Sequence, residues 1–483
     1  MDIYDYAIVG GGPSGLTLAW ILCSNNKKVV LIEKETSFGG CHRVQRVDGF
    51  FSEHGPRVYS DSYLMFKEIL SDMNLNFDDL FIEYKVNLDN IDNKTILSLN
   101  FNEKYTLVLA FLRTLINTDY GKDISINKFM YDNNFTDETI DYIGRLCRLT
   151  DGASADDYTL FQFIQLANQQ IFYKLYQPKV PNDKGLIKKW IEKINETKNI
   201  TFYLNASVDK ILLDNNKVSQ LIIIKDNKQM IIQAEKFILA IPPKHLYNLL
   251  NYSPGLENAF GNLENWKNEN SYFDYIPLTF HYYKKTKLPK LNGFPRTAWG
   301  IGFIILSDSM TFDKTEPSKT VISITITITN EPNENGKTVN QCSKDEIIEY
   351  VKSQLSFFPA PDKIIISPNV VRQAQQWINL DTAYVVTSEG NFLDYNSKFN
   401  NLFAVGIYNG NSTYHFTALE SSIQNAIEFS KNEIPELKYK YKLKRVTELA
   451  DIFYIILIII VSLLIIYTIK QYNQIKSYKT NSY

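Results

Sequence analysis

The sequence predicts an α/β protein of two interleaved lobes, followed by a helix apolar enough to cross a membrane. The pattern over 3–33 is strand, glycine turn, helix, strand. Strand patterns return at 199–241 and again at 402–406, after long stretches of helical periodicity. Because the strand-rich pieces are far apart, we expect one lobe assembled from distant segments and a second lobe formed by the insertions between them.

Composition places the chain among globular proteins and argues against several functions. At 483 residues it is too long for one simple core, and it is 45% hydrophobic with a net charge of −2. The sequence contains no basic region interleaved with aromatic residues, so it gives no indication of nucleic-acid binding. The four cysteines show no metal-ligand or disulfide spacing, so no metal site is expected.

Periodicity predicts the individual elements. Helices are expected at Tyr63–Asp72, Tyr105–Ile116, Thr159–Leu175, 344–357 and about 417–432. Strands are expected at Ile3–Val9, Ile200–Leu204, Val208–Leu213, Ser219–Ile224, Met230–Ala234, Lys236–Ala240, Tyr275–Tyr283 and Leu402–Gly406. The strict alternation over Thr320–Thr329 predicts a half-exposed strand.

The glycine turn after the first strand has the spacing of a dinucleotide-binding Rossmann unit. Gly10 would make the tight turn, Gly12 would let the backbone approach a pyrophosphate, and Gly15 would let helix and strand pack closely. Pro13 and Ser14 lie in the same loop, where the helix N-terminus presents N–H groups to the phosphates.

An acidic residue completes this unit. Glu33 ends the second strand, 18 residues after Gly15, where a carboxylate accepts hydrogen bonds from a ribose. It would repel the 2′-phosphate of NADP, so the unit predicts NAD or FAD.

Two later segments favour FAD. Gly39-Gly40 and Arg43 follow the second strand, and Gly55-Pro56-Arg57 comes shortly after. This pattern resembles the FAD-dependent superfamily of amine oxidases, protoporphyrinogen oxidases and phytoene desaturases, and the Gly-Pro-Arg form is most similar to the protoporphyrinogen oxidases. The resemblance implies FAD binding by Gly10, Gly12, Pro13, Ser14, Gly15, Glu33, Lys34, Gly39, Gly40, Arg43, Gly55, Pro56, Arg57, Val208 and Gly406.

The resemblance extends to about residue 432, with two departures. Val208 would meet the adenine through its backbone, and the helix near 417 would point at the flavin. The residue after Gly406 is Ile407 where the family usually has an acid, and Asn409 is a candidate substitute. The strand Tyr275–Tyr283 lacks the lysine that amine oxidases place near the flavin N5.

The resemblance therefore implies an FAD-dependent oxidase or desaturase that takes a hydride from a small apolar substrate. The alternatives are a flavin-containing amine oxidase, a non-catalytic membrane-tethered FAD-binding protein and a flavin-dependent sugar mutase. No catalytic side chain is assigned. The candidates for the substrate cavity are six aromatic residues, Tyr275, Phe280, Tyr282, Trp299, Trp377 and Tyr384.

The segment 452–469 contains 18 uncharged residues, which as a helix would span about 27 Å, close to the thickness of a bilayer. The basic cluster before this segment contains more basic residues than the one after it, so we expect a single-pass tail anchor with the FAD lobe facing the cytosol.

The predicted division is a first lobe of 1–85, 190–265 and 385–435, a second of 86–189 and 266–384, a basic linker at 436–451, the span at 452–469 and a tail at 470–483.

Overall fold

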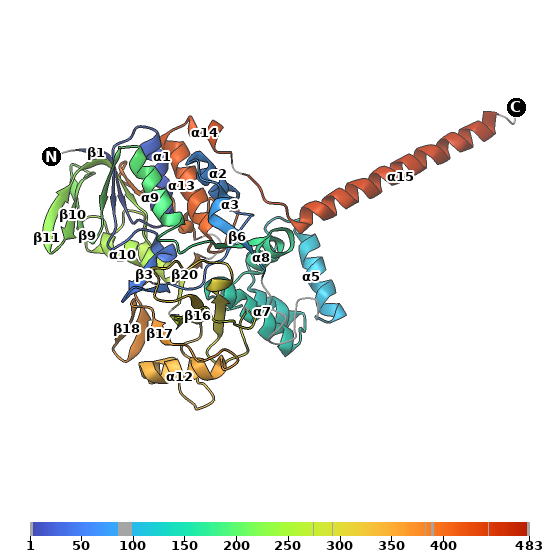
Figure 1. Cartoon of the computed structure of the whole chain (residues 1–483). Coiled ribbons are helices and arrows are strands. Elements are labelled where there is room, and N and C mark those ends of the chain that lie inside the picture. Colours follow the sequence, from blue (N-terminus) through green and yellow to red (C-terminus); the bar gives the residue numbers. More distant parts are fainter. Residues whose placement is uncertain are drawn as a thin grey trace.

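A five-stranded parallel sheet forms the centre of the first lobe in the computed structural model (Figure 1). The structure describes residues 3–85, 99–273, 275–291, 293–381, 383–387, 391–442 and 444–480. The strand order is β21-β12-β1-β2-β8. Its strands are β1 (Tyr4–Val9), β2 (Val29–Ile32), β8 (Ile200–Tyr203), β12 (Ala234–Leu239) and β21 (Leu402–Ala404).

Both faces of this sheet are covered, which explains its nearly continuous apolar strands. Ile8 and Leu31 pack under α1 (Pro13–Ser24), α9 (Leu186–Glu196) and α13 (Leu419–Glu433). On the opposite face, Ala7 and Val30 pack toward a second layer. That layer contains an antiparallel sheet of β9 (Ala206–Asp214), β10 (Lys217–Lys225) and β11 (Lys228–Ile232), with α10 (Pro243–Asn251) and α11 (Leu263–Asn268).

The second lobe contains a four-stranded sheet in the order β15-β16-β14-β17. It is formed by β14 (Ile276–Tyr282), β15 (Ile301–Ile305), β16 (Thr320–Ile326) and β17 (Lys363–Ile366), with α12 (Lys344–Gln354) beside it. Two short pairs lie nearby, β13 (Asn270–Phe273) with β20 (Ala383–Thr387) and β18 (Val370–Gln373) with β19 (Gln376–Asn379).

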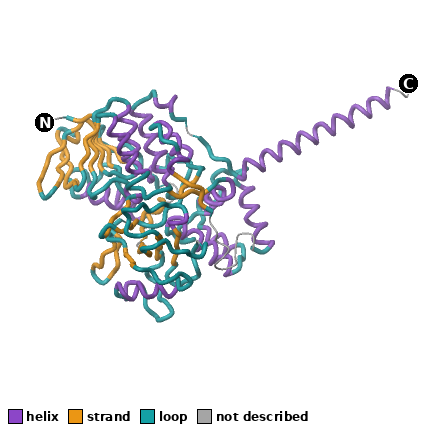
Figure 2. Tube along the Cα trace, in the orientation of Figure 1, coloured by secondary structure: helices purple, strands orange, loops and turns teal. Residues whose placement is uncertain are grey.

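The insertion between β4 and α9 is mainly helical but also contains strands (Figure 2). Its helices are α2 (Leu64–Asp72), α3 (Phe77–Leu80), α5 (Phe101–Arg113), α6 (Ile126–Asp132), α7 (Asp137–Asp151) and α8 (Leu160–Phe172). The strands β5 (Tyr59–Ser60), β6 (Phe81–Tyr84) and β7 (Leu175–Pro178) form one small sheet. The helix expected to end at Leu175 ends at Phe172, because Leu175 pairs with Ser60 and Tyr84 in that sheet.

The prediction of a half-exposed strand at Thr320–Thr329 was wrong. β16 ends at Ile326 and is buried along its whole length. Ile322 and Ile324 contribute to the core of the second lobe, whereas Ser323 and Thr325 lie on the opposite face, against Glu53 and Gly55 of the first lobe. The apolar residues of this alternation therefore face the core of the second lobe, and its polar residues face a buried polar boundary between the lobes, called the seam below. From the sequence alone, this polar face would be expected to be exposed to solvent.

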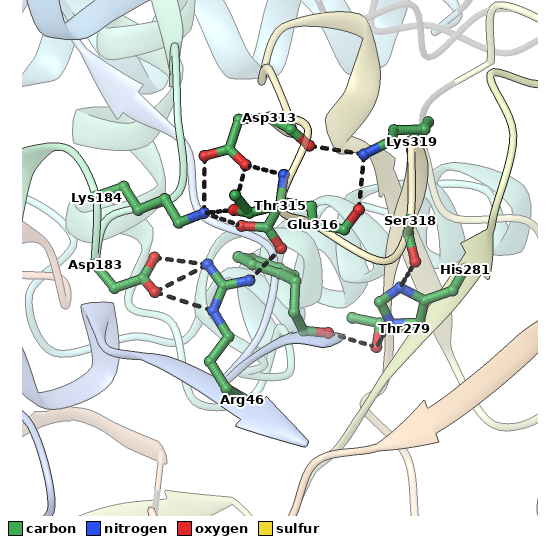
Figure 3. A network of polar contacts seen from close by, with 11 residues as sticks. Arg46, Asp183, Lys184, Thr279, His281, Asp313, Thr315, Glu316, Ser318 and Lys319 are labelled. Atoms are coloured by element: carbon green, nitrogen blue, oxygen red, sulfur yellow. Dashed lines mark hydrogen bonds and ion pairs between the residues drawn. The ribbon is translucent and has the colours of Figure 1, made fainter. Parts of the chain in front are cut away.

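Ion pairs across this seam hold the lobes together (Figure 3). The hairpin of β3 (Val44–Val47) and β4 (Phe50–Glu53) carries Arg46, which donates two 3.0 Å hydrogen bonds to Asp183 and also pairs with Glu316. Lys184 lies 2.7 Å from the same buried Glu316. Near it, His281 contacts Ser318 and Thr279, and Thr279 donates to the carbonyl of Phe51 at 3.3 Å. The hairpin is thereby fixed against the second sheet.

The chain ends in the long helix α15 (Leu449–Thr480), which projects away from both lobes (Figure 1). Leu449 to Gln474 is long and apolar enough to span a membrane, and the two lobes bury none of its most apolar stretch. The linker before it includes α14 (Leu437–Lys440). Lys440 and Lys444 there pair with Asp72 and Glu68, so part of the basic cluster is already neutralised by the protein.

Candidate functional site

The glycine loop between β1 and α1 is shaped by backbone contacts that exclude side chains. Gly10 has φ +105°, and a Cβ there would lie 2.3 Å from the carbonyl oxygen of Ala240. Gly12 is the N-cap of α1 and supplies no capping side chain, so the first N–H groups of the helix are available to a ligand. A Cβ on Gly40 would lie 3.0 Å from the Gly12 Cα, so two glycine backbones face each other without side chains.

Glu33 is attached directly to this loop. Its Oε2 accepts a 2.7 Å hydrogen bond from the N–H of Gly11, and its Oε1 accepts a 3.0 Å bond from the N–H of Glu35. Each carboxylate oxygen retains a lone pair. Burial raises the pKa of Glu33 despite these two bonds. The carboxylate is thus fixed in orientation at the end of β2.

Arg43 follows the second glycine pair and is also buried. It donates two hydrogen bonds, of 3.0 and 2.9 Å, to Asp381 of the second lobe. Burial would raise the pKa of Asp381, but the Arg43 guanidinium and the other neighbouring groups, including a hydrogen bond from Asn369, together outweigh it and the pKa is lowered. The resulting ion pair closes one side of the site.

His54, Arg57 and Tyr275 meet beside this ion pair. The Nε2 of His54 contacts the carbonyl of Asp381, and its Nδ1 faces a nitrogen of Arg57 and the hydroxyl of Tyr275. Burial and the Arg57 guanidinium lower the pKa of His54. A neutral ring that accepts at Nδ1 and donates at Nε2 fits these partners. His54 is therefore part of an ordered buried cluster.

These groups line one cavity of about 1360 Å³ between the two lobes. Its volume exceeds the ~300–1,000 Å³ typical of a site for one small ligand. Of the predicted residues, the following line it: Gly10, Gly12, Pro13, Ser14, Glu33, Lys34, Gly40, Arg43, Gly55, Pro56, Arg57, Val208 and Gly406. The cavity therefore begins at the glycine loop and reaches the second sheet at Thr325 and Thr327.

Two predicted residues, Gly15 and Gly39, lie behind the cavity wall. A Cβ on Gly15 would lie 1.9 Å from the carbonyl oxygen of Gly10, so this glycine lets α1 pack on the loop. Gly39 has φ +120°, and a Cβ there would press against Arg43 and Ile187. Both shape the loop from behind.

The suggestion that Asn409 substitutes for the missing acid was wrong. Its Oδ1 accepts a 2.7 Å bond from the N–H of Gly406, and its amide donates to the carbonyls of Leu393 and Ala404. Because these bonds face the protein interior, Asn409 shapes the turn, whereas Ile407 and Gly406 line the cavity.

The aromatic candidates are mostly core residues. Tyr275 lines the cavity, but Phe280, Tyr282 and Trp299 belong to the core of the second lobe, and Trp377 packs at its edge. The side chain of Tyr384 lies outside the described residues. Strand pairing puts Phe280 and Tyr282 on the core face, which the short strand pattern could not reveal.

Sequence reasoning missed Asp381 and Arg148. Asp381 is 338 positions from its partner Arg43, and no local motif marks it. Arg148, near the end of α7, lines the cavity, and its buried Nε has no hydrogen-bond partner. The nearby Asp141 is already paired with Arg145 at 3.1 Å. A cationic group thus faces the cavity from the second lobe.

Comparisons with known proteins agree with this geometry. Residues 8–72 match the model of an NAD(P)-binding Rossmann-like domain. The chain is 30% identical over 141 residues to UDP-galactopyranose mutase of Mycoplasma genitalium, covering 28% of this chain and 31% of the mutase. It is 25% identical over 221 residues to thioredoxin reductase of the same organism, covering 44% of this chain and 65% of the reductase. The chain thus spans less than two thirds of each relative.

Solved structures match nearly the whole chain. A putrescine oxidase bound to putrescine has a TM-score of 0.65 at 15% identity, covering 90% of this chain and 99% of the oxidase. Cyclohexylamine oxidase from Brevibacterium oxydans has a TM-score of 0.61 at 12% identity, covering 90% of this chain and 100% of that one. A candidate protoporphyrinogen oxidase from Exiguobacterium has a TM-score of 0.55 at 14% identity, covering 91% and 100%.

The fold and the glycine loop define a two-lobed protein with a dinucleotide-binding Rossmann lobe. Its fold is shared with the putrescine oxidase, the cyclohexylamine oxidase and the candidate protoporphyrinogen oxidase, and this is the fold that the resemblance in the sequence implied. The observed cradle fits a dinucleotide such as the FAD that the resemblance in the sequence implies. The two facing glycines leave room for a pyrophosphate, and the uncapped start of α1 and the fixed Glu33 carboxylate offer a donor and an acceptor.

Proposed function

We propose that this chain is an FAD-dependent oxidoreductase that oxidises or desaturates a small, largely apolar substrate in the cavity between its lobes. The observation that carries the proposal is the cavity itself, which joins the glycine loop of one lobe to the sheet of the other. Its volume accommodates a dinucleotide and a further molecule. The glycine loop and the start of α1 would hold FAD, which when bound would supply the redox chemistry of hydride transfer.

The chain's own residues would bind the cofactor, close the site and contact the substrate. The glycine loop and the start of α1 hold phosphates, and Glu33 orients a ribose. The Arg43–Asp381 pair and the His54 cluster close the site and exclude water. Tyr275, Phe303 and Leu166 offer apolar surface to a substrate. With the pKa of His54 lowered, this histidine stays neutral near pH 7 and adds no positive charge beside Arg57.

Amine oxidation is the weaker alternative. β14 contains no lysine, and Lys284, which follows it, is exposed. The cavity wall also carries the cationic Arg57 and Arg148, which would repel a protonated amine. The structural likeness to amine oxidases therefore supports the fold, while the lack of a lysine on β14 and the two arginines on the cavity wall weigh against amine oxidation.

A second candidate is a flavin-dependent sugar mutase. The observation that favours it is the identity to UDP-galactopyranose mutase over 141 residues. This match covers under a third of that enzyme, and the turn after Gly406 is occupied by Ile407. We therefore rank it below oxidation.

The test is anaerobic reduction of the full-length protein, purified in detergent with its flavin. Candidate substrates are added without oxygen, and the flavin absorption band is followed. We expect bleaching by an apolar desaturation or oxidation substrate and none by putrescine or other amines.

Bleaching by amines alone would establish the amine oxidase alternative. Conversion of UDP-galactopyranose without net bleaching would establish the mutase. A flavin that dithionite reduces but that no substrate class affects would favour a non-catalytic protein.

The apolar helix α15 supports membrane attachment of this activity. We propose that it spans the bilayer once, with both lobes on the cytosolic side, as the basic residues before it suggest. Flotation of the full-length protein with lipid vesicles tests the attachment. Protease accessibility of the lobes in intact cells tests the side.

A further inference from the structure

The outer face of α5 carries an apolar stripe that the described residues leave exposed. Phe101, Tyr105 and Val108 lie on one side of the helix and are 79%, 55% and 41% exposed. The rings of Phe101 and Tyr105 stack with centroids 6.3 Å apart and planes within 8°. The opposite side of the helix, with Leu107, Ala110 and Phe111, is buried in the core of the first lobe and helical insertion. The helix is therefore apolar on both sides, which is unusual for a helix facing water.

This stripe is held rigidly. Asn100 and Glu103 form a capping box at the start of α5, with reciprocal hydrogen bonds of 2.9 Å. Glu103 also accepts bonds from the N–H of Thr136 and the hydroxyl of Thr139 at the start of α7. Because these bonds tie α5 to its neighbour, its outer side chains are presented in a fixed position.

The stripe lies beside the base of the candidate span. α5 contacts α15, and Figure 1 shows the two helices meeting where α15 leaves the body, with α5 running across its direction. The start of α15 is fastened to α8, because Asn168 accepts a bond from the N–H of Leu449 at 3.1 Å. If α15 crosses a bilayer, the surface around its base faces the headgroups.

The charges on α5 suit that position. Its exposed charged residues are Lys104 and Arg113, both positive, while its acid Glu103 is buried. Anionic headgroups attract such residues, and aromatic side chains favour the interfacial layer. A helix with an apolar stripe flanked by cations has the character of a helix that lies in the plane of a membrane surface.

We propose that the outer face of α5, formed by Phe101, Tyr105 and Val108, is a second membrane contact that lies in the interfacial layer of an anionic bilayer. This inference rests on the proposed spanning by α15 but is independent of the flavin chemistry. The contact would restrict the orientation of the body on the membrane. The end of α8 shares this surface, because Tyr173, which lines the cavity, accepts a hydrogen bond from the N–H of Thr447 in the linker. One wall of the cavity would therefore face the lipid.

The test is fluorescence quenching of the full-length protein reconstituted into phosphatidylcholine–phosphatidylserine vesicles with brominated acyl chains. The probe is Tyr105→Trp, and the matched control is Ile231→Trp on β11, which is 42% exposed and lies on the side of the molecule away from α15. After subtraction of the wild-type signal, we expect blue-shifted emission at position 105 that brominated lipid quenches. We expect no quenching at position 231.

Further variants separate the outcomes. Tyr105→Trp combined with Phe101→Glu and Val108→Glu should still float with the vesicles, because α15 is intact, but should lose the quenching. A Tyr105→Trp protein that floats while its introduced tryptophan remains unquenched would overturn the proposal. Cross-linking between copies at this face, together with an unquenched probe at position 105, would assign the face to a dimer instead. Wild-type protein that fails to float would overturn the anchor proposal and this inference, leaving the oxidoreductase proposal unaffected.

Discussion

Arg43 and Asp381, 338 positions apart in sequence, form a two-bonded ion pair at the boundary between the lobes. Arg43 is 5% exposed and Asp381 13% exposed. Arg43 follows the second glycine pair of the first lobe, and Asp381 lies between two strands of the second. The pair thus fixes the segment that lines the cofactor end of the cavity against the substrate lobe.

Removing one partner of this pair should be costly. Asp381→Ala removes both hydrogen bonds of the buried Arg43 and leaves it with Glu35 at 3.6 Å. We expect destabilisation of about 3–5 kcal/mol, because an uncompensated buried charge remains. Thermal unfolding of the full-length protein in detergent measures it. The double variant Arg43→Met with Asp381→Ala should recover much of the loss, and no recovery would show that the two residues act separately.

Two substitutions in the glycine loop should separate an effect on folding from an effect on cofactor binding. A Cβ at Gly12 would lie 3.7 Å from the Gly40 Cα, so Gly12→Ala should fold, yet its methyl group would obstruct a pyrophosphate. We expect at least about tenfold weaker FAD binding, or ~1.4 kcal/mol. Gly15→Ala should instead disrupt folding, since its Cβ would lie 1.9 Å from the Gly10 oxygen. A Gly12→Ala protein with wild-type flavin affinity would contradict this role.

Glu53 should make stability depend on pH. It is buried on β4, its Oε1 has no hydrogen-bond partner, and burial raises its pKa to about 7. The folded state therefore binds this proton more tightly than the unfolded state, so its contribution to stability is lost as pH rises from about 4.5 through 7. Glu53→Gln should be nearly neutral at pH 5 and stabilising by about 1–3 kcal/mol at pH 8. Unfolding temperatures of both proteins at the two pH values test this, and equal differences at both would refute it.

Arg148 should select for anionic groups in the substrate. Its buried Nε is unpartnered at the cavity wall, and guanidinium groups bind carboxylates through paired hydrogen bonds. Titration with benzoate, followed by the change in the flavin spectrum, should show binding about tenfold weaker in Arg148→Met, or ~1.4 kcal/mol. Benzamide serves as the neutral control and should be unaffected. Equal weakening for both would mean that the variant distorts the cavity.

The first lobe could be predicted well because its signals are local. The strand, glycine turn, helix and acid of 3–33 lie within one short segment, and β1, α1 and β2 form there as expected. Gly10 and Gly15 could be predicted individually because each meets a backbone carbonyl so closely that a side chain would not fit.

The interface between the lobes could not be predicted in this way. The partner of Arg43 and the true environment of Thr320–Ile326 depend on segments hundreds of residues apart. Alternation in β16 has the same pattern whether its polar face meets water or a buried seam, so periodicity alone could not reveal the burial of Ser323 and Thr325. Asn409 was misjudged for a related reason, because its side chain bonds back to its own turn.

The most direct test of the central claim is the absorption spectrum of the purified full-length protein, with its cofactor released and quantified. We predict an oxidised flavin spectrum and FAD, rather than FMN or NAD, in the released material, in an amount that approaches one per chain. A colourless protein that still gains no bound flavin when incubated with FAD would contradict the account.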